Sequence, residues 1–418
     1  IGEVVVVGGV RRSALISLSN LNDDQMSHAK SGMWWENEGQ RALANNSVAY
    51  KEKPQMGTFM REWLSLYESK SGERGIFNRQ SAQKQAAKNG RRDSEQDFGC
   101  NPCSEIILRP YQFCNLSEVV VRENDTQQTL TEKVRLATIL GTFQSTLTDF
   151  KYLRKIWKDN TEEERLLGVS LTGIMDNELT AGRSAHLGMN IGATLDALRD
   201  VAINANKAMA DQLGIPQSAA ITCVKPSGTV SQLVDSASGI HARHNPYYIR
   251  TVRGDNKDPL TQFMIAQGIP AEPDVMKPDS TTVFSFPMKS PNRAVTRNAM
   301  SAIEQLELWL MYQRYWCEHK PSVTISVKEE EWMDVGSWVY KHFDEVSGIS
   351  FLPFSEHTYK QAPYQDCTEE EYQEMKAQMP KSIDWSALQE FEKEDTTSGG
   401  RELACTAGVC EVVDLTAA

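Results

Sequence analysis

The chain has 418 residues, of which 40% are hydrophobic and 24% are charged, a composition typical of a globular protein with more than one structural unit. Its formal net charge of −12 argues against a general nucleic-acid-binding surface, because contacts with a phosphate backbone need a basic stripe that this sequence lacks. No apolar run approaches the length of a bilayer span, so no membrane association is expected.

Short β-rich segments alternate with helical segments along the chain, which is the pattern of an α/β fold. Strands are expected at residues 3–7, 13–17, 105–108, 118–121, 168–171, 219–224, 281–286 and 322–327. Helices are expected at residues 58–67, 132–150, 195–213, 302–319 and 369–379. Thr129 and Glu132 would cap the second helix, and Trp309 and Trp316 are expected in the core.

The segment Asn101-Pro102-Cys103-Ser104-Glu105 carries the most informative side chains of the sequence. Pro102 disfavours a helix, and in an extended segment alternate side chains share a face, so Asn101, Cys103 and Glu105 are expected to point the same way. An amide, a thiol and a carboxylate on one face can hold a polar substrate, react with it and move its protons. Cys114, eleven residues after Cys103, could supply a second thiol.

The cysteines also allow other readings. Cys100 and Cys103 form a CxxC pair that suits half a zinc site or a redox pair, but no second CxxC or CxxH follows nearby, so no metal is expected. Cys103 and Cys114 could also be ordinary buried residues. The eight unevenly spaced cysteines favour a reducing compartment over a disulfide framework, and a cytoplasmic location is therefore expected.

Residues 225–231 read as a tight turn between a strand and the start of a helix. Ser227, Thr229 and Ser231 offer hydroxyls, Gly228 permits close approach of the backbone, and the helix start would aim amide groups at an anion. The segment is therefore a candidate phosphate-binding loop. The alternative is that these residues only cap the helix, and the spacing of glycine and lysine excludes a Walker A loop.

Two histidines, His241 and His244, are spaced as a metal pair would be, but no carboxylate or third histidine lies close to them in the sequence. Ordinary hydrogen-bonding roles near the site are expected for both. Near the end of the chain, the polar segment 393–401 leads to Cys405 and Cys410. A flexible tether with two thiols suits electron transfer by thiol–disulfide exchange, whereas an incidental tail or a metal clip are the alternatives.

Residues 101–119 closely resemble the active-site finger loop and following strand of ribonucleotide reductases, and the phosphate-loop candidate resembles their substrate-phosphate loop. The resemblance implies that Cys103 is the thiyl-radical cysteine. It implies that Asn101 and Glu105 are its substrate-binding and acid–base partners. It also implies that Cys114 is one of two thiols that reduce the sugar.

The resemblance extends to the tail and covers residues 4–410. It implies that Cys405 and Cys410 re-reduce the active site and are recharged by a thioredoxin-like protein. Segments 246–253 and 322–354 resemble the monomeric, triphosphate-using class II branch, which implies adenosylcobalamin as cofactor and ribonucleoside triphosphates as substrates. The pair Tyr247-Tyr248 leaves a class I large chain, which receives its radical through stacked tyrosines, as an alternative.

The fold implied by the resemblance is a ten-stranded α/β barrel with a central finger loop, incomplete on its N-terminal side. Residues 1–255 would form the catalytic barrel portion, 256–383 a region that closes the barrel and faces the cobalamin, and 384–418 a flexible redox tail. The family needs a third active-site cysteine before the finger loop, but no cysteine precedes Cys100. We therefore expect an N-terminal reductase fragment that carries this cysteine and the allosteric site. A catalytically incomplete nucleotide-binding fragment is the alternative.

Overall fold

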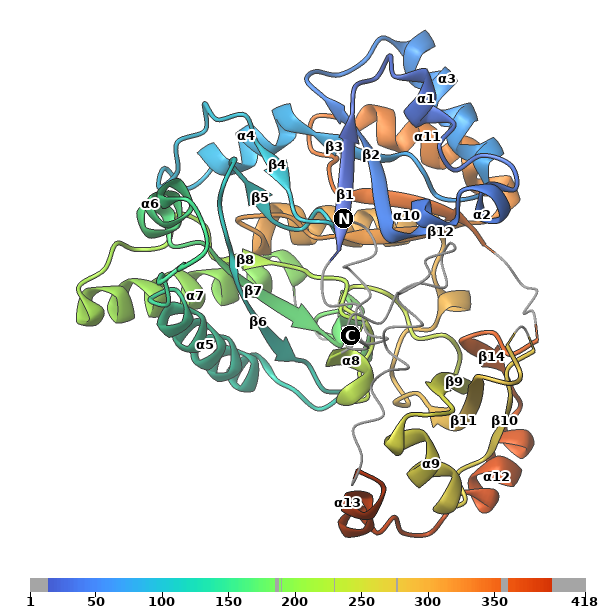
Figure 1. Cartoon of the computed structure of the whole chain (residues 1–418). Helices are drawn as coiled ribbons and strands as arrows, with labels where there is room; N and C mark the ends of the chain where they lie inside the picture. Colours follow the sequence, from blue (N-terminus) through green and yellow to red (C-terminus); the bar gives the residue numbers. More distant parts are fainter. Residues whose placement is uncertain are drawn as a thin grey trace, which may run out of the picture.

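A computed structural model describes residues 14–184, 188, 190–228, 230–275, 277–354 and 360–392 (Figure 1). The strand expected at 3–7 and the tail cysteines Cys405 and Cys410 lie outside these residues. Within them, strands and helices alternate along most of the chain, which confirms the predicted α/β class.

Two sheets form the main part of the molecule. The larger has the order β1 (Leu15–Ser19), β2 (Ala44–Tyr50), β3 (Gly75–Asn78), β13 (Ile349–Pro353) and β12 (Val323–Val327). The smaller consists of the parallel strands β6 (Asn115–Val120), β7 (Leu167–Thr172) and β8 (Thr222–Cys223). In the larger sheet all neighbours are parallel except β3 and β13, which pair antiparallel. An isolated bridge between Val224 and Pro321 places the end of β8 beside the start of β12.

The strands do not close into a barrel in the described part of the chain. Through the Val224–Pro321 bridge they form one array that runs from β6 at one end to β1 at the other. In the described residues β1 pairs only with β2, and β6 pairs only with β7, so each has one edge without a strand partner. The sheets confirm the α/β class, but they do not confirm the ten-stranded barrel that the resemblance implied.

Helices flank these sheets and connect their strands (Figure 1). The α-helices of this part are α1 (Asp24–Ser27), α2 (Trp34–Asn37), α3 (Met56–Ser69), α4 (Arg79–Ala87), α5 (Gln127–Gln144), α6 (Lys155–Glu164), α7 (Ile191–Leu213), α8 (Val230–Leu233), α10 (Ala302–Met311) and α11 (Trp332–Lys341). Short 3-10 turns lie at Gly39–Leu43, Ile174–Asp176, Arg297–Ala299 and Glu329–Glu331. None of the helices in the described residues combines the length and apolar character needed to cross a lipid bilayer.

Two helix predictions need correction. The capping box of α5 is formed by Thr126 and Thr129 rather than by Thr129 and Glu132, because the helix begins one turn earlier than its apolar pattern indicated. The helix predicted at 302–319 ends at Met311 and continues as a π-turn at Tyr312–Trp316. The chain leaves the helix there because the amides of Glu318 and His319 both donate to the carbonyl oxygen of Thr222 on β8.

A separate antiparallel sheet lies beside the main sheets, at the lower right of Figure 1. Its order is β10 (Ala271–Pro273), β11 (Thr281–Lys289), β9 (Tyr247–Asp255) and β14 (Tyr364–Asp366). It is accompanied by α9 (Pro259–Ala266), α12 (Glu369–Gln378), α13 (Leu388–Phe391) and a 3-10 turn at Trp385–Ala387. Because β9 pairs with β11 along its whole length, this sheet extends across the boundary expected at residue 255.

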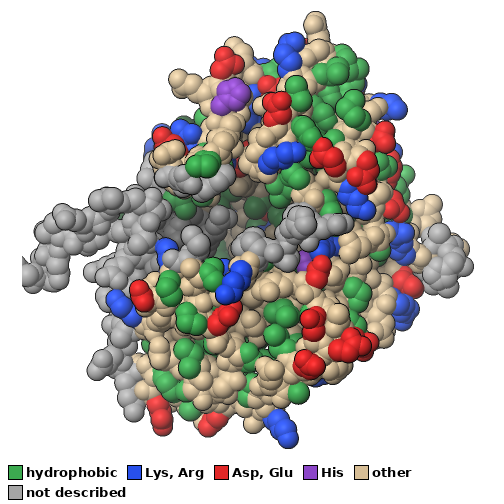
Figure 2. Space-filling view, turned by 90° about the vertical axis from the view of Figure 1, so that its right-hand side faces the viewer, with side chains coloured by type: hydrophobic (Ala, Val, Ile, Leu, Met, Phe, Trp, Pro, Cys, Tyr) green, Lys and Arg blue, Asp and Glu red, His purple; other side chains and the backbone are tan. Residues whose placement is uncertain are grey.

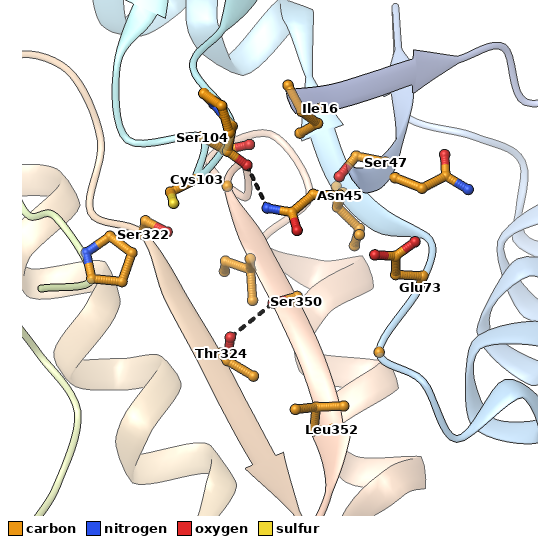
Figure 3. A pocket seen from close by; sticks show the side chains of 18 of the residues that line it. Ile16, Asn45, Ser47, Glu73, Cys103, Ser104, Ser322, Thr324, Ser350 and Leu352 are labelled. Carbon is orange, nitrogen blue, oxygen red and sulfur yellow. Dashed lines mark hydrogen bonds between the residues drawn. The ribbon is translucent and has the colours of Figure 1, made fainter. Parts of the chain in front are cut away.

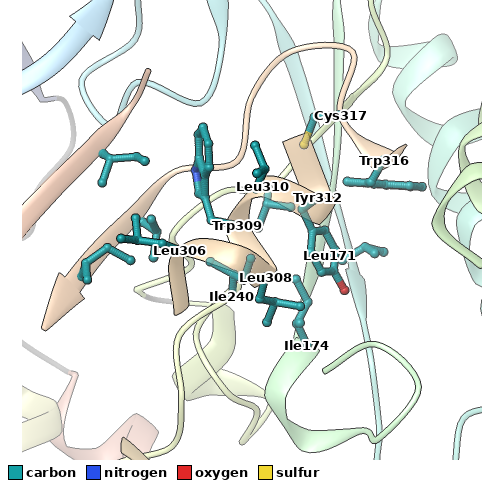
Figure 4. Close-up of a cluster of buried hydrophobic side chains, with 14 of the residues drawn as sticks. Leu171, Ile174, Ile240, Leu306, Leu308, Trp309, Leu310, Tyr312, Trp316 and Cys317 are labelled. Carbon is teal, nitrogen blue, oxygen red and sulfur yellow. The ribbon is translucent and has the colours of Figure 1, made fainter. Parts of the chain in front are cut away.

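The core beneath the main sheets includes the fully buried side chains of Trp309, Tyr312 and Trp316 (Figure 4). Each places its polar atom on a backbone carbonyl, as buried aromatic groups with a polar end generally do. The indole of Trp309 donates to Pro321 over 2.8 Å, that of Trp316 to Cys223 over 2.7 Å, and the Tyr312 hydroxyl to Thr180 over 2.8 Å. The core positions predicted for both tryptophans are thereby confirmed.

Replacing Trp316 by alanine should therefore destabilise the fold strongly. The change creates a cavity and leaves the Cys223 carbonyl without its donor, and such losses amount to about 3–5 kcal/mol. Urea denaturation monitored by circular dichroism measures the effect. Tyr152→Ala is the matched control, because its ring is 98% exposed and its loss should change stability by less than about 0.5 kcal/mol. Equal effects of the two substitutions would contradict this view of the core.

On the face shown in Figure 2, Lys and Arg side chains are scattered among Asp and Glu side chains. The positive charges drawn there do not merge into a continuous stripe along the described surface. This distribution agrees with the acidic net charge and gives no support to a phosphate-backbone contact on this face.

Candidate active site

The Asn101–Glu105 segment, called the finger loop below after the resemblance noted above, forms the tip of a small hairpin. The strands β4 (Gly99–Cys100) and β5 (Ile107–Leu108) pair antiparallel. At the tip, the Ser104 amide donates to the Asn101 carbonyl over 2.9 Å, and the Asn101 side chain accepts from the Ile106 amide over 3.0 Å. The loop is thus a tight turn and not the extended segment predicted from the sequence. Pro102 accounts for the difference, since proline also suits the second position of a turn.

Cys103 lies at a cavity of about 240 Å³ between the finger loop and the larger sheet (Figure 3). The lining mixes apolar side chains with polar ones, which include Ser47, Glu73, Ser322, Thr324 and Ser350. Asn45, also in the lining, donates to the Pro102 carbonyl over 2.7 Å and ties the loop to β2. The thiol therefore meets a space suited to a small ligand rich in hydroxyl groups.

Glu73 is the charged side chain that Figure 3 shows at this cavity. One of its carboxylate oxygens pairs with Lys30 over 2.7 Å, and the other is buried without a hydrogen-bond partner among the described residues. Burial raises the pKa of this carboxyl, although Lys30 acts against the shift. An unpaired buried acceptor at a cavity is expected to bind a donor of the ligand.

Glu105 is almost completely buried, and neither carboxylate oxygen has a well-formed hydrogen bond among the described residues. Burial raises its pKa, and the Asn101 amide and the ammonium groups of Lys225 and Lys320 offset only part of this shift. Such a carboxyl releases and accepts a proton more readily near neutral pH than an exposed one. The environment fits the acid–base role predicted for Glu105.

Cys114 lies directly before β6 and packs against Leu166, Ala219 and Ala220. Burial, reinforced by the charge of Glu105, raises the pKa of its thiol. The group is therefore a protonated thiol at neutral pH, which suits the donation of hydrogen rather than attack as a thiolate. The influence of Glu105 on this thiol shows that the two predicted residues lie in one electrostatic neighbourhood.

The candidate phosphate loop adjoins the same cavity, which Pro226 lines together with Cys103. The hydroxyl oxygen of Ser227 accepts from the Ser231 amide over 3.1 Å, and the Ser231 hydroxyl donates back to the Ser227 carbonyl. Both hydroxyls are buried and make these helix-capping contacts, as the alternative interpretation of the sequence, a helix cap, predicted. Gly228 is exposed, and Thr229 lies outside the described residues. Phosphate binding by this loop stays a prediction, with the backbone at Gly228 as its accessible part.

The two histidines have hydrogen-bonded positions. His241 places Nδ1 2.9 Å from the Ser238 carbonyl, and its Nε2 accepts from the Thr324 amide, while burial lowers its pKa. The Nε2 atom of His244 lies 2.6 Å from the Oδ1 atom of Asp366. Among the described residues, no group of three or more Cys, His, Asp or Glu side chains is placed to hold a metal ion.

The tyrosine pair lies away from the cavity. Tyr247 and Tyr248 are on β9, where their rings contact Tyr372 and Tyr364 at centroid distances of 5.2 and 6.0 Å. The described residues that line the cavity beside Cys103 include no tyrosine. The geometry therefore gives no support to a stacked-tyrosine route to this cysteine.

Several known proteins are similar to this chain in sequence. No family model matches the chain. Adenosylcobalamin-dependent ribonucleoside-triphosphate reductases from Lacticaseibacillus paracasei and Lactobacillus acidophilus are each 28% identical to it over 99% of the chain and 58% of their own length. The enzyme of the same name from Euglena gracilis is 28% identical over 90% of the chain and 50% of its own length. The chain is thus similar in sequence to these reductases over nearly its whole length.

Solved structures agree with this assignment at the level of the fold. A B12-dependent class II ribonucleotide reductase superposes with a TM-score of 0.72 and 23% identity, covering 95% of this chain and 57% of that one. The class Id reductase alpha subunit of Actinobacillus ureae gives a TM-score of 0.53 and 12% identity, covering 81% and 70%. The chain thus spans 57% of the length of the class II protein and 50–58% of the length of these relatives.

Three further groups lie at or near the site and were not predicted from the sequence: the partly buried Glu73 and the fully buried Cys223 and Lys320. Cys223 stands on β8 in register with Ser170 of β7, and burial raises the pKa of its thiol well above the usual value. The sequence gives no direct signal for these residues, because a lone Glu, Cys or Lys near a strand end is ordinarily a surface or core residue. Their importance comes from packing against the finger loop and the cavity.

Proposed function

We propose that this chain forms the catalytic part of an adenosylcobalamin-dependent ribonucleotide reductase, which converts ribonucleoside triphosphates to 2′-deoxyribonucleotides by a thiyl-radical mechanism. The observation that carries the proposal is the finger-loop thiol of Cys103 at a cavity partly lined by polar side chains, with the buried carboxyl of Glu105 on the same loop. The homology to enzymes of that name, over nearly the whole chain, supports the same reaction.

Each residue then has a defined part in the chemistry. The thiyl form of Cys103 removes the 3′-hydrogen of the ribose, Glu105 accepts the 3′-hydroxyl proton, and Asn101 hydrogen-bonds the sugar. Cys114 and a second thiol give two protons and two electrons. One proton leaves with the 2′-hydroxyl as water, the other proton and the two electrons form the new C–H bond at the 2′-carbon, and the thiols become a disulfide. Glu105 then returns its proton to the 3′-oxygen. Return of the hydrogen from Cys103 to the 3′-carbon restores the radical on sulfur.

The cavity beside Cys103 fits the nucleoside part of the cofactor. An adenosyl group offers hydroxyl donors, and the unpaired oxygen of Glu73 together with Asn45, Thr324 and Ser350 offers matching partners. When bound, adenosylcobalamin supplies the radical through homolysis of its cobalt–carbon bond. The protein supplies placement, exclusion of water and the proton transfers.

A further polypeptide segment is proposed to complete the barrel. The free edges of β1 and β6 in the described residues suit added strands, which would extend the array toward ten strands. Such a segment would also bring the third active-site cysteine, since no cysteine precedes Cys100 in this chain, and the allosteric site. The partial coverage of the relatives is consistent with this proposal.

The tail is proposed to carry electrons between the site and a thioredoxin-like reductant. A Cys405→Ser/Cys410→Ser variant should complete a single turnover with pre-reduced thiols, fail in thioredoxin-driven cycling, and regain much of its rate with a small diffusible dithiol. Single-turnover and steady-state assays on the assembled enzyme measure these rates. Loss of the first turnover would assign the pair to the chemical step, and undiminished thioredoxin-driven cycling would make the tail cysteines incidental.

The proposed function is tested by titrating the chain with cobalamin and nucleotide, with and without an N-terminal reductase partner, and assaying deoxynucleotide. The proposal predicts binding of both ligands and product formation with adenosylcobalamin in the assembled form. Nucleotide binding without product in every assembly would instead favour the catalytically incomplete fragment. Product formation only with a metal-containing radical subunit would favour the class I alternative.

A further inference from the structure

Lys320, two residues before β12, is the most unusual buried charge near the finger loop. It has no exposed surface, and its Nζ donates to the Ser347 hydroxyl over 3.1 Å and lies 4.3 Å from the centre of the Phe77 ring. Within the described residues, no carboxylate lies within ion-pair distance of this ammonium group. A buried charge without an opposite partner is costly, so a purely stabilising role does not explain it.

The position of Lys320 is tied to the finger loop. Its backbone amide donates to the Glu105 carbonyl over 3.0 Å. Gly348 is close to both the Lys320 ammonium group and the loop. A Cβ added at Gly348 would lie 3.6 Å from Lys320 Nζ and 3.0 Å from the Ser104 carbonyl oxygen. The ammonium group therefore sits against the inner side of the turn that carries Cys103.

The charged and titratable groups around this position come from several elements. Cys100 on β4 and Glu105 on the finger loop both interact with the ammonium of Lys320, while burial lowers the pKa of Lys320 to about 8. Lys225 also acts on Glu105, and Arg79 acts on Cys100. With a pKa near 8, Lys320 is mainly protonated at neutral pH and favours a negative charge on Glu105.

We propose that Lys320 is a positioning residue of this site, whose buried ammonium group lies behind the finger loop and favours the ionised form of Glu105, the form that accepts a proton. This inference rests on the proposed reductase function. Lys320 acts through Glu105 and lies behind the loop, so it makes no contact with the reacting atoms. Burial of the Lys320 charge destabilises the fold, but the same charge favours the ionised Glu105 carboxylate that can accept a proton.

The first test is the pH profile of deoxynucleotide formation by the assembled enzyme carrying Lys320→Met. Methionine keeps most of the length of the side chain and removes the charge. The acid limb of the profile should move to higher pH, with much of the rate recovered at alkaline pH. Lys84→Met is the control, because Lys84 is a half-exposed lysine paired with Asp344 and should leave the profile unchanged. A uniform loss of rate at every pH would overturn the proposal.

The second test does not depend on activity. Because the pKa of Lys320 lies below its usual 10.5 in the folded chain, the unfolded chain binds more protons between about pH 8 and 10.5. The buried charge of Lys320 therefore lowers the free energy of unfolding fully below pH 8, and this loss disappears as the pH rises toward 10.5. Lys320→Met should therefore melt at a higher temperature than the wild type at pH 7, with the difference shrinking between about pH 8 and 10.5.

The two tests separate failure of the inference from failure of the proposed function. A lower melting temperature of Lys320→Met at pH 7 would show that the lysine is needed for stability and would overturn the inference. A higher melting temperature, with no deoxynucleotide from the wild-type assembly itself, would overturn the proposed function instead. Lys320→Arg, which keeps the charge, should retain the wild-type acid limb if it folds, and a displaced limb in this variant would also contradict the proposal.

Discussion

Replacing Cys103 by serine should reduce deoxynucleotide formation by the assembled enzyme to the level of an enzyme-free control. The substitution changes one atom, so the turn, the cavity and the Asn45–Pro102 hydrogen bond should all remain. A serine hydroxyl holds its hydrogen much more tightly than a thiol does, and the radical that removes the 3′-hydrogen can no longer form on this side chain. The loss should be complete with every reductant.

The measurement is product formation with saturating cofactor and substrate, accompanied by melting curves and cobalamin titrations that should match those of the wild type. Cys367→Ser provides the control, because Cys367 follows β14 in the separate antiparallel sheet and should be dispensable. Measurable deoxynucleotide from Cys103→Ser, above background and sustained over several turnovers, would remove Cys103 from the centre of the chemistry.

Replacing Glu105 by glutamine should slow sugar reduction by about 10²–10⁴-fold while leaving nucleotide binding nearly intact, which is the usual scale for loss of a general base. Glutamine has nearly the same shape but cannot accept the proton. Glu163→Gln is the control, since that carboxylate is an exposed partner of Arg109. An unchanged rate in single-turnover assays of Glu105→Gln would contradict the assignment.

The pH dependence gives a second readout for the same residue. Burial raises the pKa of Glu105, so the carboxyl stays protonated at pH values at which an exposed carboxyl is ionised. The rate of the wild type should therefore fall as the pH drops through this raised pKa. Glu105→Gln should lose this acid limb and show a flat, low rate over the same range. An acid limb that persists in the variant would assign the titration to another group.

The candidate site could be proposed from the sequence, because its predicted side chains come from a few adjacent residues. Asn101, Cys103 and Glu105 lie within five positions, so even a wrong prediction of their backbone conformation left them on one loop. The structure replaces the extended segment by a turn, yet the Asn101 amide still acts on the Glu105 carboxyl. Local patterns of this kind survive errors in secondary structure.

Features that depend on tertiary packing could not be predicted. The burial of Lys320 follows from the way residues 317–322 leave the π-turn at Tyr312–Trp316 and run along β8, and no local pattern indicates that path. The hydroxyls of Ser227 and Ser231 fitted a phosphate site and a helix cap equally well, and only the observed hydrogen bonds distinguish their present partners. The strand β9 was not predicted, because its charged side chains obscure its alternation.

The central claim, that a thiyl radical on Cys103 removes the 3′-hydrogen of a ribonucleotide, is tested most directly with a 3′-deuterated ribonucleoside triphosphate. The measurement is the single-turnover rate of deoxynucleotide formation by the assembled, adenosylcobalamin-loaded enzyme with deuterated and ordinary substrate. We expect a slower rate with the deuterated substrate, with the deuterium recovered at the 3′-carbon of the product. Formation of deoxynucleotide at equal rates, with the deuterium lost to solvent from the start, would contradict hydrogen transfer through Cys103.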